Sequence, residues 1–141
     1  MRLVLFACAV MVASATLASA ADVPKVTTTT IISSDTTVTG QKIVVPDNPV
    51  VVASLSTLPP GARLPVHKHP YAHYGYMLAG ELTVTNDEIG KSFTIKKGDF
   101  LIEMNNTWHH GQNNGKVPVK ILIIDQIPTG VSSNVVLKSA K

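Results

Sequence analysis

Short runs rich in Val, Ile and Thr alternate along the chain with Gly, Pro, Asn and Asp, and no long stretch repeats at the helical period. Residues that favour turns separate these runs, as at Pro59-Pro60-Gly61 and Lys97-Gly98-Asp99. The pattern predicts an all-β protein built as a sandwich or barrel. The expected strands cover residues 26–32, 42–45, 50–58, 74–78, 81–85, 92–95, 100–104, 119–125 and 135–138.

Two of these segments have distinct patterns. Residues 119–124 are apolar except for Lys120, which predicts a central strand buried on both faces. Residues 27–30 are a run of threonines ahead of the main pattern. That run is open to two interpretations, an added edge strand or a flexible lead-in.

The first twenty residues have the pattern of a cleavable secretory signal. Arg2 precedes an apolar run, and small residues follow up to Ala18-Ser19-Ala20. An uncleaved membrane anchor would need about twenty apolar residues, whereas serines and threonine interrupt this run early. We therefore expect a signal peptide at residues 1–20, export to the periplasm or medium, and one domain over residues 21–141.

Composition narrows the range of partners. The only cysteine, Cys8, lies in the expected signal segment, so a disulfide is not expected in the mature chain. The formal net charge is only +3, and the lysines are scattered apart from Lys96-Lys97. Neither a nucleic-acid surface nor membrane contact after cleavage is expected, and a small-molecule ligand or substrate is the expected partner.

All five histidines fall between His67 and His110, and three lie in the string His67-Lys68-His69-Pro70-Tyr71-Ala72-His73. On a strand, His67 and His69 point to the same face with Cα atoms about 6.6 Å apart, so both can bind one ion. Pro70 ends such a strand and lets the chain bring His73 beside the pair. The alternatives are ordinary polar histidines or an adventitious metal-binding tract.

A second segment makes the resemblance to a known family specific. The first cupin motif, G-x5-H-x-H-x3-E-x6-G, is matched by Gly61, His67, His69 and Gly80, with His73 in place of its glutamate. The second motif, G-x5-P-x-G-x2-H-x3-N, is matched in spacing by Gly98, Met104, Asn106, His109 and Asn113. Its proline and middle glycine are replaced, although Asn106 readily enters the left-handed region that such a turn uses.

The resemblance to cupins implies a double-stranded β-helix, or jelly-roll barrel, over about residues 50–125. It implies one divalent transition metal, Zn, Fe, Ni, Cu or Mn, inside the barrel, held by His67, His69, His73 and His109. It also implies a possible homodimer formed through edge strands.

The replacement of glutamate by His73 has consequences for the expected chemistry. Four neutral imidazoles leave the charge of the ion uncompensated, which favours anionic ligands. Glu103 is then the nearest acidic candidate for a catalytic acid or base. His110 is expected on the face opposite His109, as a surface residue or a supporting residue of the site. Three tyrosines and Trp108 are expected to line or pack around the pocket.

Two functions fit these features. The first is a metal-dependent enzyme of dioxygenase, isomerase, lyase or cyclase type that acts on a small chelating or anionic substrate. The second is a non-catalytic binding module outside the cytoplasm that captures a metal ion or small metabolite.

Overall fold

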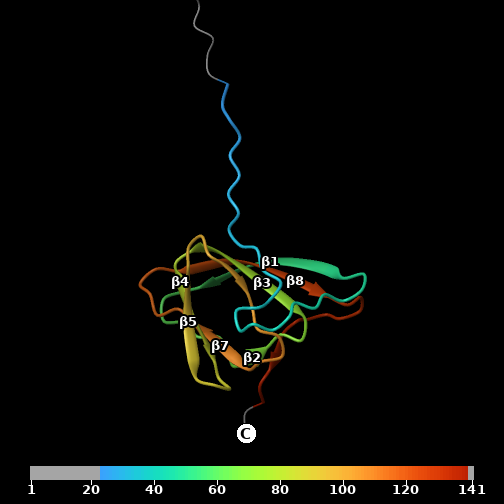
Figure 1. The fold of residues 1–141 in the computed structure, drawn as a ribbon. Coiled ribbons are helices and arrows are strands. Elements are labelled where there is room, and N and C mark those ends of the chain that lie inside the picture. Colours follow the sequence, from blue (N-terminus) through green and yellow to red (C-terminus); the bar gives the residue numbers. More distant parts are fainter. Residues whose placement is uncertain (1–22, 140–141) are drawn as a thin grey trace, which may run out of the picture.

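The computed structural model describes residues 23–139, so the expected signal segment lies outside the described residues. Within them the fold consists of two β-sheets without a helix (Figure 1), and therefore no helix there could cross a membrane. The strands are β1 (Val50–Leu58), β2 (His67–Lys68), β3 (Ala72–Ala79), β4 (Glu81–Asn86), β5 (Lys91–Lys96), β6 (Phe100–Ile102), β7 (His109–Gln112), β8 (Val119–Ile127) and β9 (Val136–Leu137).

The chain passes back and forth between the two sheets. One sheet has the strand order β1-β8-β3-β6 and the other β5-β4-β7-β2-β9, and the pairings are antiparallel. Hairpins alone would keep successive strands in one sheet, whereas here most connections cross to the other, as in a jelly roll. The predicted all-β, double-stranded β-helix is confirmed.

Alternating side chains from both sheets form the hydrophobic core. In β4, for example, Leu82 and Val84 are 4% and 1% exposed, while Thr83 between them faces outward and is half-buried. The buried cluster consists of Leu58, Met77, Leu82, Val84, Ile95, Leu101, Met104, Val119 and Ile121.

Most predicted strands exist within two residues of their expected bounds, and β1 has the predicted ones. The pattern of apolar residues does not predict β2 and β7, although the spacing of His67 and His69 indicates a strand at β2. Both strands are short and polar, so they lack the apolar alternation by which strands are predicted.

Two predicted strands are wrong. Residues 26–32 form no strand and are exposed, with Val26 95% exposed, because no neighbouring strand pairs with them. Of the two interpretations of the threonine run, the edge strand is therefore excluded. Residues 42–45 contribute only a single bridge, between Lys42 and Thr36. High β-propensity does not produce a strand without a partner.

β8 is a central strand, as predicted, and pairs with β1 and β3. The prediction that β8 is buried on both faces is only partly right. Ile121 is buried toward the other sheet, but Leu122 and Ile124 on the outer face are only half-buried. The outer face of this sheet therefore presents apolar side chains to its surroundings.

Gly80, the last glycine of the first motif, offers a test of the fold. It has a φ of +74°, and a Cβ there would lie 2.8 Å from the carbonyl oxygen of Pro118. We expect Gly80→Ala to lower the free energy of unfolding by about 3 kcal/mol, from backbone strain and steric conflict together. Gly61→Ala is the matched control, because Gly61 has a φ of +80° but open space around it. That control should lose only about 1 kcal/mol in urea unfolding; equal losses would contradict the steric argument.

Candidate metal centre

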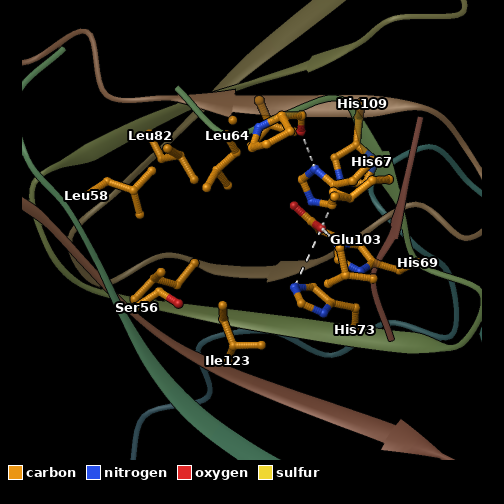
Figure 2. Close-up of a pocket in the computed structure, with 16 residues that line it drawn as sticks. Ser56, Leu58, Leu64, His67, His69, His73, Leu82, Glu103, His109 and Ile123 are labelled. Carbon is orange, nitrogen blue, oxygen red and sulfur yellow. Dashed lines mark hydrogen bonds and ion pairs between the residues drawn. The ribbon is translucent and has the colours of Figure 1, made fainter. Parts of the chain in front are cut away.

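Four buried histidines meet between the two sheets (Figure 2). His67 of β2 pairs with His109 of β7 in the five-stranded sheet, and His69 follows β2. His73 comes from β3 of the opposite sheet. Their exposed fractions are between 1% and 8%, and all four line one cavity. The structure thus brings together the four histidines that the sequence predicts as ligands.

Three of the imidazoles are oriented by a hydrogen bond from Nδ1 to a main-chain carbonyl oxygen. The pairs are His67 with Pro65 (2.7 Å), His69 with Asn134 (2.8 Å) and His109 with Thr107 (2.8 Å). Because a carbonyl oxygen can only accept, Nδ1 carries the proton and Nε2 keeps a free lone pair in the neutral ring. Each ring is therefore prepared to bind a metal through Nε2.

Glu103 places its carboxylate among these Nε2 atoms. Its Oε2 lies 2.9 Å from Nε2 of His69 and 3.2 Å from Nε2 of His109. All three atoms are buried, yet none is aligned with a hydrogen-bond partner. With bonds of about 2.1 Å, two ligands of one ion would lie about 3.0 Å apart in an octahedral site and about 3.4 Å apart in a tetrahedral one. The unpartnered atoms therefore fit a shared metal ion.

Two overlapping groups of three residues have the spacing of a metal site. One consists of His67, His69 and His109, and the other of His69, His73 and Glu103. Within each group the potential ligand atoms lie within 4.8 Å of one another. Because His69 belongs to both, the two groups form one continuous donor set.

Glu103 faces inward because of the register between β3 and β6. Tyr74 pairs with Ile102, and the next main-chain contact is a 3.0 Å hydrogen bond from Glu103 N to His73 O. Residues opposite one another on adjacent strands share a face, so Glu103 and His73 both point into the barrel. The carboxylate absent from position 73 thus reaches the site from the neighbouring strand. The expectation that the protein leaves the charge of an ion uncompensated is wrong.

Burial and mutual contact decide the protonation of these groups. Burial lowers the pKa of His67 to about 4, so this ring is neutral near pH 7. Burial alone would raise the pKa of Glu103, but contact with His109 and His69 outweighs it, and the pKa lies well below its usual value. The pKa of His109 is raised because the attraction of Glu103 exceeds the effect of burial. Glu103 is therefore an anion inside the barrel.

Two supporting residues were missed by the sequence analysis. Asp125 Oδ1 accepts a 2.7 Å hydrogen bond from His73 Nδ1 and a 2.6 Å bond from the amide of Asn134. Asn134 is 4% exposed, and its main-chain oxygen holds His69. Burial alone would raise the pKa of Asp125, but the hydrogen bonds from His73 and Asn134 outweigh it. The pKa therefore lies below its usual value, and the carboxylate stays ionised. These two residues orient both His69 and His73.

Other predicted site residues lie elsewhere. His110 is on the face opposite His109, as expected, but it is buried, and its Nδ1 bonds to Asp87 at 2.8 Å. Neither the tyrosines nor Trp108 line the histidine cavity, so of the two roles expected for the tyrosines only packing remains. The ammonium groups of Lys68 and Lys138 lie 5.0 Å and 5.7 Å from the centre of the Trp108 ring.

The residues of the second motif shape the approach to β7. Asn106 adopts a φ of +49°, which confirms the prediction that it replaces the turn glycine. Met104, at the proline position, is fully buried in the core. Asn113 is also fully buried, and its amide donates to the carbonyl oxygens of Leu58 and Val117. This motif therefore anchors the turns around His109.

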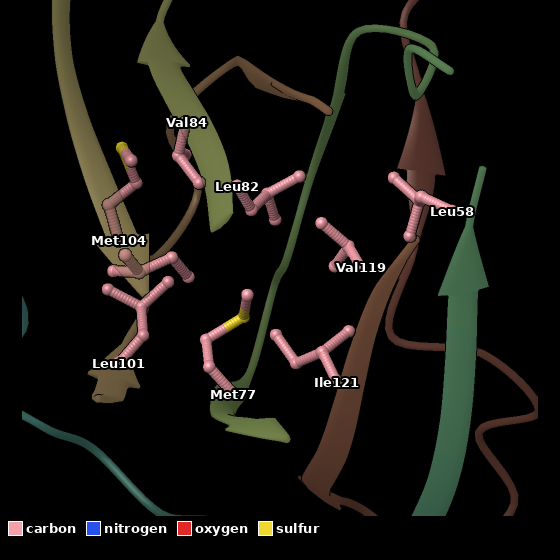
Figure 3. Close-up of a cluster of buried hydrophobic side chains, with 9 residues drawn as sticks. Leu58, Met77, Leu82, Val84, Leu101, Met104, Val119 and Ile121 are labelled. Carbon is pink, nitrogen blue, oxygen red and sulfur yellow. The ribbon is translucent and has the colours of Figure 1, made fainter. Parts of the chain in front are cut away.

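A cavity of about 210 Å³ opens beside the cluster. Its wall includes Leu58, Leu82 and Ile121 of the hydrophobic core (Figure 3). Val135 and Leu137 also line it and are 45% and 60% exposed, so they lie at its mouth. The site therefore combines a polar end with an apolar chamber that reaches the surface.

A profile of the cupin domain matches residues 54–125. The chain belongs to the cupin family. No match to this cupin was found among curated proteins. Its histidine cluster and the adjacent Glu103 suit a metal ion, as the resemblance of the motifs implies.

Solved structures share the fold of this cupin at low sequence identity. The polyketide cyclase RemF from Streptomyces resistomycificus has a TM-score of 0.54 and 15% identity over 64% of this chain and 62% of its own. The oxalate decarboxylase of Lactobacillus farciminis, a formate complex, has a TM-score of 0.52 and 22% identity over 62% of this chain and 26% of its own.

A third structure is similar over most of its length. It is an uncharacterized conserved protein with a double-stranded β-helix domain from Klebsiella pneumoniae, with a TM-score of 0.52 and 21% identity over 67% of this chain and 90% of its own. This cupin covers less than two thirds of the cyclase and decarboxylase chains. At these identities the likeness concerns the fold alone.

Proposed function

We propose that this cupin is a metal-dependent enzyme that binds one divalent transition ion between its sheets and acts on a small chelating substrate. One observation carries the proposal: four imidazoles turn Nε2 into one cavity beside the buried Oε2 of Glu103, which no hydrogen bond satisfies. Buried polar atoms without partners are rare, and an ion shared by these atoms would satisfy them together.

The donor set is His67, His69, His73 and His109, with Glu103 as an additional oxygen. Imidazole and carboxylate together suit zinc, iron, nickel, copper or manganese. When bound, the ion would act as a Lewis acid toward an oxygen of the substrate. The hydrogen bonds at Nδ1 hold the rings in place, and the apolar chamber excludes water around the reacting group.

The role of Glu103 follows from its position. The sequence predicts it as a catalytic acid or base, and its low pKa keeps it in the form that accepts a proton. Its contacts with Nε2 of His69 and His109 favour a second role, as an oxygen ligand. We propose that Oε2 serves the metal, which leaves Oε1 to accept a proton from a bound substrate.

Elemental analysis combined with turnover measurements tests the enzyme proposal. Protein loaded with each candidate metal would be assayed for consumption of diketones, thiols and flavonoids, with oxygen uptake recorded in parallel. One metal per chain together with turnover of one substrate is the expected result. A protein with neither metal nor turnover would exclude the proposal.

A binding module is the second candidate. Among residues 23–139, the cavity wall offers one polar side chain besides the histidines and Glu103, the hydroxyl of Ser56, so few groups are available for proton transfer. A metal-loaded protein that retains a tightly bound small molecule, without turnover, would favour this alternative.

Export is part of the proposal and is supported by the pattern of residues 1–20. Intact mass measured on protein recovered from the periplasm or the medium should correspond to a chain beginning at Ala21. An intact mass that includes Met1 to Ala20 would contradict cleavage.

Asn134 provides a prediction about how the metal is held. Asn134→Ala removes the amide contacts to Asp125 and Tyr71 that fix the main-chain oxygen holding His69. We expect metal affinity to fall about 10–100-fold, as for other residues that orient metal ligands. Ser133→Ala, at an exposed neighbour, is the control and should retain the affinity. Equal affinities in a competition titration with a chromogenic chelator would contradict this role.

We also propose a homodimer formed through β1. This edge strand is exposed along most of its length, and Leu55 is 63% exposed beside the half-buried Leu122. Long apolar edge strands are normally covered by a partner. In light scattering, Leu55→Lys should convert a dimer into a monomer, whereas Ile89→Lys, 62% exposed in the β4–β5 turn, should not. A wild-type monomer would contradict the proposal.

A further inference from the structure

The cavity is polar at one end only. Figure 2 shows His67, His69, His73, His109 and Glu103 grouped at one end, with Ser56, Leu58 and Leu82 at the other. Between these ends the wall is made of aliphatic side chains, among them Leu64 and Ile123. A bound molecule must therefore place an apolar body against most of the cavity surface.

No lysine or arginine lines the cavity within the part of the chain that the structure describes. Apart from the histidines and Glu103, Ser56 is the only described residue of the wall whose side chain can form a hydrogen bond. A second charged group on a ligand would lose its hydration there without gaining a partner of opposite charge. Burial of an unpaired charge is strongly unfavourable, so the distal end rejects charged substituents.

The charge at the polar end limits the head group as well. With a metal bound through Nε2, the rings that donate through Nδ1 to carbonyl oxygens carry no charge, and a carboxylate ligand from Glu103 contributes one negative charge. Asp125 is bonded to His73 and Asn134 behind the ligands, so the ion and its one carboxylate ligand carry a single net positive charge. One anionic head group neutralises it, whereas a dianion leaves an uncompensated negative charge inside the barrel.

We infer that the site selects small molecules with one anionic, oxygen-containing chelating group on an uncharged apolar body. Dicarboxylates and amino acids lie outside this class because each carries a second charged group. Sugar phosphates lie outside it because the phosphate is largely a dianion at pH 7 and the sugar is polar. The inference rests on the proposed metal site and deepens it. The cavity volume of about 210 Å³ limits the body to a few carbon atoms, since typical ligand pockets occupy about 300–1,000 Å³.

Calorimetric titration of the zinc-loaded protein with linear hydroxamates tests the substrate class. Aceto-, butano- and hexanohydroxamate share one chelating head and differ only in chain length. Affinity should rise about fourfold for each methylene that enters the apolar chamber. The hydroxamate of hexanoate that carries a carboxylate at its far end should bind at least about tenfold more weakly than hexanohydroxamate. A flat series, or a preference for the doubly charged ligand, would overturn the inference.

A charge placed at the distal end provides the matched variant. Ser56 is half-buried on the edge strand β1 and lines the cavity, so a lysine there can offer a partner to the distal carboxylate. Ser56→Lys should at least halve the factor by which hexanohydroxamate binds more tightly than its carboxylate analogue. Ser54→Lys adds the same charge at an exposed position of β1 outside the cavity wall and should leave that factor unchanged. An unaltered factor in Ser56→Lys would contradict the distal location of the ligand tail.

Zinc content measured on the same samples separates the two levels of the proposal. If the protein binds one zinc per chain but its affinity for hydroxamates does not change with chain length, the proposed substrate class is wrong and the metal site is retained. Absence of zinc binding removes the proposed function, and the substrate class with it.

Discussion

His109→Ala should deprive the protein of its bound metal and of the stability that the metal provides. His109 is 1% exposed, and its Nε2 lies among the buried atoms that lack partners. At a metal concentration about a hundredfold above Kd, binding stabilises the native state by about 2.7 kcal/mol. For a domain of this size that corresponds to a Tm increase of about 10 °C. The increase should be absent in His109→Ala, and elemental analysis should find no stoichiometric metal.

For each variant, the Tm is measured with metal and with chelator, and the difference between the two values is compared. Loss of a buried ring lowers both values, so the difference reports metal binding without the contribution of packing. His110→Ala is the matched control. His110 is the adjacent residue, equally a buried histidine, but it bonds to Asp87 outside the cluster. Its replacement should lower both Tm values and keep the difference between them. Full metal content in His109→Ala would refute the site.

Glu103→Gln preserves the shape of the side chain and removes its charge. We expect metal affinity to fall at least tenfold, about the loss expected when a group beside the metal is removed. The physical reason is that the anion at 2.9 Å and 3.2 Å from two ligand nitrogens no longer balances the ion. The measurement is a competition titration with a chromogenic chelator. Unchanged affinity with loss of turnover would instead assign Glu103 the purely catalytic role.

Exchange of His73 and Glu103 tests whether the two positions are interchangeable. His73→Glu alone places two carboxylates on adjacent strands, and their repulsion should weaken the site. In the double variant His73→Glu/Glu103→His the same groups face the same cavity from exchanged strands. Affinity should recover in part, a positive coupling in the double-mutant cycle, because Asp125 still faces the carboxylate at position 73. If the losses in metal affinity of the two single variants add up in the double variant, the two side chains are not interchangeable.

The sequence predicts that the four histidines lie together, and the structure brings them to one cavity. His67 and His69 share a face because strand side chains alternate, whereas the place of His109 is implied by the resemblance to the second cupin motif. The position of Glu103 was harder to predict because it depends on the register between β3 and β6. A partial signal existed: Glu103 is two residues after Leu101, a core residue, and therefore falls on the same face.

Asn134 could not be predicted from local patterns. It lies 65 residues from His69 along the chain, and its contribution to the His69 hydrogen bond comes from the main chain, which any residue type carries. The strands expected at residues 26–32 and 42–45 failed for a related reason. Their composition favours extended backbone, but pairing depends on which strands the finished fold brings alongside.

The segment from Asn134 through β9 contributes both to the mouth of the cavity and to the orientation of His69. It supplies Val135 and Leu137 at the mouth and the carbonyl oxygen that orients His69. β9 pairs through only two residues, and elements with so few contacts open most often in local fluctuations. One such opening would widen the entrance and release His69 together. Ligand entry and extraction of the metal by a chelator should therefore both depend on the rate at which this segment opens.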